Sequence, residues 1–111
     1  MNRNMLYLED KPVKLQYTLG SLIKSEQLGI KLPTLLQPEK LSKRDAYKWL
    51  YVGLLADYPE VTLEQVKDAF SQRDTEQLLD AIYTAHKIDR TDKDSLRQLS
   101  FYMEEVRSKW L

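Results

Sequence analysis

SKRDAYKWLYVGLLA, residues 42–56, is the most apolar helical pattern in the chain. Ser42 followed three residues later by Asp45 is a variant of the capping box, which marks the start of a helix. From Ala46 onward, apolar and aromatic residues lie nearly all round the expected helix, and such a helix is buried on most sides. We therefore expect it at the centre of the fold, where Gly53 would let another stretch of backbone come close.

Two shorter helices are expected after the central one, and each opens with a recognisable cap. Thr62 with Gln65 forms a capping box for a helix that runs through Phe70. Asp74 with Gln77 starts the next helix, whose inner face is apolar.

The C-terminal segment, residues 95–111, predicts an amphipathic helix that begins at Thr91 or Asp94. Its apolar residues are three and four positions apart, which is the heptad spacing. This seam could pack on the chain's own domain or on another chain. Because tryptophan often anchors interfaces, its last residue slightly favours a partner. The seam consists of Leu96, Leu99, Met103, Val106 and Trp110.

Before the central helix, residues 5–18 are expected to form a β-hairpin that leans on helices. Apolar residues 5–8 precede a turn, and from Val13 apolar and polar residues alternate, which indicates a half-buried strand. Thr18 would then cap a helix for which Gly29 is the natural C-terminal residue. Two prolines punctuate the loop that follows.

These elements predict a mainly α fold with a small N-terminal β-hairpin (α+β), in which about five helices surround the buried central helix. The length of 111 residues fits a single domain, 1–111. Its expected parts are the hairpin at 5–18, a helical core at 19–88 and the terminal amphipathic helix at 95–111.

The net charge is zero, because 17 basic side chains balance 17 acidic ones. The balance is uneven along the chain: residues 1–48 carry nine basic and five acidic groups (+4), and residues 49–111 carry eight and twelve (−4). A wholly basic nucleic-acid binder and an acidic solvating tail are both disfavoured. Because the two halves of the chain carry opposite net charge, we expect a possible homo-oligomer in which subunits contact one another head to tail.

Cysteine is absent, which excludes disulfides and cysteine-based zinc sites. No apolar run approaches the ~20 residues that span a bilayer, and the N-terminus reaches acidic residues too soon for a signal peptide. We therefore expect a cytoplasmic protein that does not contact a membrane.

Residues suited to catalysis are sparse. His86 is the single histidine, and we interpret it as a residue at the edge of the core; the alternative, that it binds a metal together with Asp89, lacks a third ligand. Paired carboxylates such as Glu104 and Glu105 fall on helix faces that we expect to be exposed. The glycine-rich phosphate motifs are missing. We expect no enzymatic activity, no cofactor and no metal.

Lys40–Lys48 is the one stretch that resembles a nucleic-acid site. Basic side chains there are interleaved with Tyr47, and Trp49 follows, so single strands could bind by charge and stacking. Cations at a helix N-terminus oppose the helix dipole, and the aromatic residues belong to the most apolar helix. We therefore disfavour nucleic acid as a partner.

Three motifs together carry a resemblance: YTLGSL at residues 17–22, YVGLL at residues 51–55 and YPEVTLEQV at residues 58–66. Their order, after a short strand pair, resembles the tail assembly chaperones of siphophages and of prophages in Gram-positive bacteria. The match covers about residues 5–88 and leaves out the terminal helix.

The resemblance implies a non-enzymatic chaperone that coats the aggregation-prone tape measure protein. In this family the tail tube protein then displaces the chaperone, which acts in the host cytoplasm and is absent from the mature virion. A longer form made by ribosomal frameshift is also common in the family. The alternatives are a small helical adaptor or oligomerisation module and, less favoured, the single-strand binder. The partner-binding residues predicted from the pattern are Leu99, Met103, Val106, Trp110, Tyr47 and Tyr51.

Overall fold

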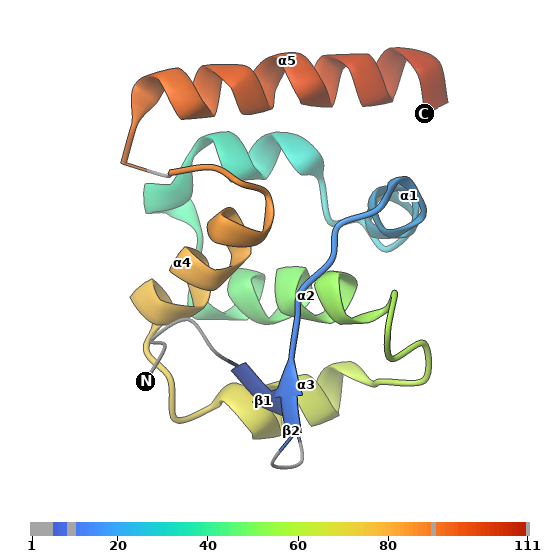
Figure 1. Cartoon of the computed structure of the whole chain (residues 1–111), viewed down its shortest axis with the longest axis vertical. Coiled ribbons are helices and arrows are strands. Elements are labelled where there is room, and N and C mark those ends of the chain that lie inside the picture. The colour runs from blue at the N-terminus through green and yellow to red at the C-terminus, as the bar shows by residue number, and fades with distance from the viewer. Residues whose placement is uncertain (1–5, 9–10, 90, 111) are drawn as a thin grey trace.

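The computed structural model describes residues 6–8, 11–89 and 91–110. Its element order confirms the predicted fold class: a two-stranded hairpin is followed by helices (Figure 1). The elements are β1 (Leu6–Leu8), β2 (Lys11–Val13), α1 (Leu19–Gln27), the 3₁₀ helices η1 (Leu32–Leu36) and η2 (Pro38–Lys40), α2 (Lys43–Leu54), α3 (Leu63–Phe70), α4 (Thr75–Ala85) and α5 (Lys93–Trp110).

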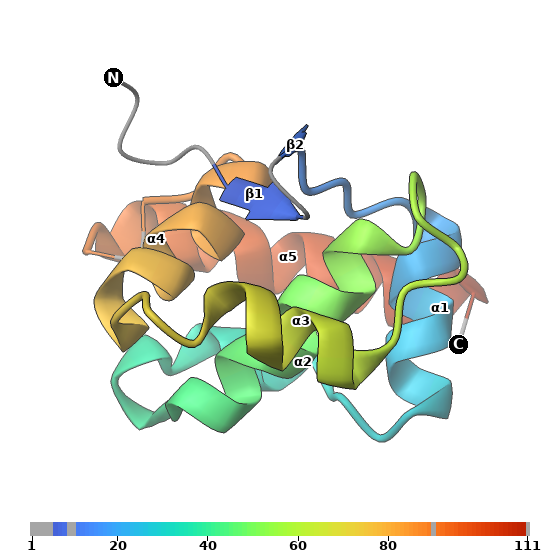
Figure 2. The same cartoon turned by 90° about the horizontal axis from the view of Figure 1, so that it is seen from below.

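Helix α2 lies at the centre, as its apolar pattern predicts. It packs against α1, α3 and α4, while α5 lies at the end of the molecule opposite the hairpin and α3 (Figures 1 and 2). Its capping box is complete: Ser42 Oγ accepts from the Asp45 N–H at 3.2 Å, and Asp45 Oδ2 accepts from the Ser42 N–H at 3.0 Å. Trp49 and Leu50 are fully buried within it.

The caps of the next two helices are also confirmed. Thr62 with Gln65 opens α3 and Asp74 with Gln77 opens α4, each by a reciprocal capping box. The start of α5 differs from both expected positions. The helix begins at Lys93, and Asp92 is its N-cap, because Asp92 Oδ1 accepts a hydrogen bond from the Asp94 N–H at 3.0 Å.

Strand β2 is shorter than expected, while residue 5 and the expected turn at residues 9–10 lie outside the described residues. Three residues of each strand pair in antiparallel register, with Leu6 opposite Val13, and the expected strand does not continue to Thr18. After β2 the backbone instead bonds to a helix, because the Gln16 N–H donates to the carbonyl oxygen of Gly53 in α2 at 2.9 Å. The alternation survives without a sheet, since Leu15 is buried while Lys14 is exposed.

Helices α1 and α4 end in the same motif with different residues. Gly29 and Lys87 both have positive φ angles, 80° and 61°, and each is followed by an isoleucine N–H that bonds back across the last turn. A lysine in this conformation is strained, whereas a glycine is not.

We therefore expect Lys87→Gly to stabilise the protein by about 1 kcal/mol and Gly29→Ala to destabilise it by a similar amount. Urea unfolding of both variants measures the difference. Equal effects of the same sign would contradict the assignment of strain to Lys87.

Candidate functional site

The terminal seam is the first predicted partner site, and the structure packs it on its own domain. Leu99, Met103 and Val106 are 2–5% exposed and belong to the core, which is the intramolecular alternative. While α5 is docked, these three side chains cannot touch a partner. Their role in partner binding stays a prediction that requires α5 to leave, and the side chain of Trp110 lies outside the described residues.

Tyr47 and Tyr51, the second predicted pair, are half-buried on α2 and pack against the core. The Nζ atom of Lys43 lies 6.0 Å from the centre of the Tyr47 ring, at the outer limit of a cation–π contact. Both rings keep part of their surface open, so their role in partner binding remains a prediction.

Among the side chains of α5 that the structure describes, the exposed aromatic ones are Phe101, at 64%, and Tyr102, at 43%. Phe101 lies opposite the buried seam, because it follows Leu99 by two positions, about 200° round a helix. Helical periodicity in the sequence alone would have identified this outward position. Both rings are therefore accessible to a partner while α5 stays docked.

The basic cluster at Lys40–Lys48 does not offer the predicted stacking surface. Trp49 is 1% exposed, so its indole cannot stack on a base in this fold. Lys43 is also engaged within the chain, because its Nζ donates to the carbonyl oxygen of Ser71 at 3.0 Å. The charge remains at the surface, but one of the two aromatic groups is absent from it.

His86 caps α4 from within an aromatic cluster. Its ring is stacked on Tyr17, with ring centres 4.0 Å apart and planes at 17°, and Trp49 approaches edge-on at 6.2 Å. Nε2 is buried and has no hydrogen-bond partner. Burial lowers the pKa of His86 from 6.5 to about 4, and burial also raises the pKa of Tyr17. The cluster therefore holds a neutral imidazole.

This geometry agrees with the interpretation of His86 as a residue at the core edge. Asp89, the other half of the metal alternative, accepts hydrogen bonds from the backbone and the hydroxyl of Thr91, at 2.9 and 2.6 Å. In the described part of the chain, no three histidine or acidic side chains are placed to hold a metal ion.

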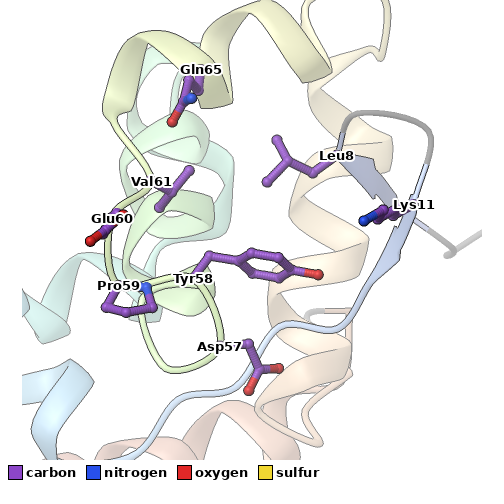
Figure 3. Close-up of a pocket in the computed structure, with 8 residues that line it drawn as sticks. All are labelled: Leu8, Lys11, Asp57, Tyr58, Pro59, Glu60, Val61 and Gln65. Atoms are coloured by element: carbon purple, nitrogen blue, oxygen red, sulfur yellow. The ribbon is translucent and has the colours of Figure 1, made fainter.

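An open cleft of about 480 Å³ lies between the hairpin and the α2–α3 connection (Figure 3). Leu8 projects into it from the hairpin and Tyr58 from the opposite side, and buried Val61 also lines it. Asp57 Oδ2 accepts a hydrogen bond from Gln16 Nε2 at 3.1 Å, which ties the rim to the segment after β2. The cleft thus brings apolar side chains together with the charged residues Lys11, Asp57 and Glu60.

Comparison with known protein families, with curated proteins and with solved structures finds no match to this chain. None of the helices in the described ranges has the length and apolar character that crossing a bilayer requires.

Proposed function

We propose that this protein is a phage tail assembly chaperone, which binds and solubilises the tape measure protein while the tail tube assembles. The proposal starts from the three motifs at residues 17–22, 51–55 and 58–66. The single observation that carries it is that residues of the first two motifs meet in the folded chain.

Tyr17 makes that contact. A Cβ atom added to Gly53 would lie 2.8 Å from the Tyr17 ring, so the first motif fills the space that the second leaves open. The Tyr17 hydroxyl donates to the carbonyl oxygen of Trp49 at 2.7 Å. Residues of a shared family core are expected to pack together, whereas chance matches need not. This packing supports the view that the motifs resemble the family because they form the same core.

The surface also suits a protein that holds a client and releases it. Partly open aromatic rings, among them Phe101 and Tyr102, lie among charged residues on α5. Small apolar areas rimmed by charge bind weakly, but many copies of the protein bound along one long client would give a high overall avidity. Under this proposal the protein acts in the host cytoplasm, without a cofactor, and leaves before the virion is complete.

Co-expression tests the function. We expect the soluble fraction of the tape measure protein from the same phage genome to rise several-fold when this chain is present. The control is Leu50→Asp at equal expression, because a charge at a fully buried position of α2 prevents folding. No rise with both proteins well expressed, or an equal rise with the unfolded variant, would contradict the proposal.

A further inference from the structure

Helix α5 is joined to the rest of the described chain by apolar contacts. The polar contacts of Lys93–Lys109 are all local: its first turn is capped by Asp92, and the Lys109 Nζ–Glu105 Oε1 ion pair, at 2.9 Å, lies within the helix. The seam residues whose side chains are described, Leu96, Leu99, Met103 and Val106, carry no N–H or O–H group that could form such a bond. In the described ranges, no hydrogen bond or ion pair therefore fixes α5 to the surface that it covers. That surface is centred on η1 (Leu32–Leu36) and is called the seat below.

The surface beneath α5, unlike α5 itself, is held to the rest of the fold by a hydrogen bond. Helix α5 makes its largest contact with η1, and η1 is held to α4 because the buried hydroxyl of Tyr83 donates to the carbonyl oxygen of Leu35. Leu35 itself is fully buried. Since this bond does not involve α5, we expect the apolar seat around η1 to keep its shape when α5 moves away.

The occupant that this seat fits is visible in the structure. Leu99, Met103 and Val106, spaced four and three residues apart, are buried on it, while Leu96 one turn earlier is half-buried. A groove that binds one face of an amphipathic helix contacts apolar residues at this spacing. The seat thus selects a helix of α5's own pattern.

We propose that α5 is an exchangeable cover, and that the apolar seat centred on η1 binds an amphipathic helix of a client protein with the same spacing. That the client is a helical segment of the tape measure protein rests on the proposed function; the exchange itself does not. Because a tethered α5 is always at high local concentration, it competes with the client and closes the seat again afterwards. The fold then supplies its own means of release.

The test uses the full chain and a fluorescent peptide of residues 93–110 as the probe. We expect the peptide to bind, and a peptide carrying Met103→Ser to bind at least about tenfold more weakly, because it loses a buried apolar contact. A peptide carrying Phe101→Ser is the matched control and should bind like the unchanged peptide, since Phe101 lies on the outer face.

The same substitution in the full chain should act in the opposite direction. Met103→Ser weakens the chain's own cover, so the unchanged peptide should bind it about tenfold more tightly than it binds the parent chain. Val106→Ala is a milder version in case Met103→Ser fails to fold, and near-ultraviolet circular dichroism, to which buried Trp49 and Tyr83 contribute, reports the fold.

The proposal is overturned if folded seam variants bind the peptide no more tightly than the parent chain does. It is equally overturned if light scattering shows a second copy filling the seat as a swapped dimer. If the tape measure protein becomes more soluble but the peptide does not exchange, this inference is refuted and the proposed function is kept. If the peptide exchanges but solubility does not rise, the proposed function is refuted and the exchange of α5 is kept.

Discussion

Gly53→Ala is expected to lower the free energy of unfolding by about 2 kcal/mol, although alanine is the better helix former. The added Cβ would lie 2.8 Å from Cζ and Oη of Tyr17 and 3.1 Å from Cδ2 of Leu15. The Tyr17 ring cannot swing away cheaply, because it bonds to the Trp49 carbonyl and stacks on His86. Urea unfolding followed by circular dichroism measures the change.

Gly20→Ala is the matched control for this prediction, since it is also a helical glycine. A Cβ there would meet Thr18 Oγ1 at 3.7 Å, an ordinary contact, so we expect no loss and a gain of up to about 1 kcal/mol. In the Tyr17→Ala background, Gly53→Ala should lose most of its cost, which a double-mutant cycle detects. If both glycine substitutions changed stability alike, close packing at Gly53 would be refuted.

The features that the sequence predicts well are those set by neighbours along the chain. Capping boxes depend on two residues three positions apart, so the starts of α2, α3 and α4 could be read directly. The buried centre follows from the density of apolar residues in α2. The role of Gly53 was predictable in kind, because a glycine inside a packed helix usually marks a close approach.

The features that the sequence does not predict depend on distant partners. The hydrogen bond from the Gln16 N–H to the Gly53 carbonyl joins the segment after β2 to α2, and local alternation cannot reveal it. The heptad seam is the same for a docked helix and for a partner-binding one, so spacing alone left both alternatives open. The stack of His86 on Tyr17 joins residues far apart in sequence, and only the fold brings them together.

The second large effect is a loss of stability in mild acid that originates at His86. Desolvation of the half-buried ring, whose Nε2 is enclosed, lowers its pKa to about 4, whereas the unfolded chain takes up the proton near pH 6.5. The stabilisation is therefore complete above pH 6.5 and is lost as the pH falls through the range from 6.5 to 4. We expect unfolding free energy to drop by about 2 kcal/mol between about pH 7 and pH 5.

Urea unfolding at a series of pH values measures this loss, and His86→Phe is its control. Phenylalanine can keep the stack on Tyr17 but has no group that titrates, and it removes the unpartnered Nε2. The variant should therefore lose little stability over the same range. Because the chain has a single histidine, its imidazole signals in proton NMR are unambiguous. An imidazole that titrated near pH 6.5 in the folded chain, or equal slopes for both proteins, would show that His86 does not control this acid response.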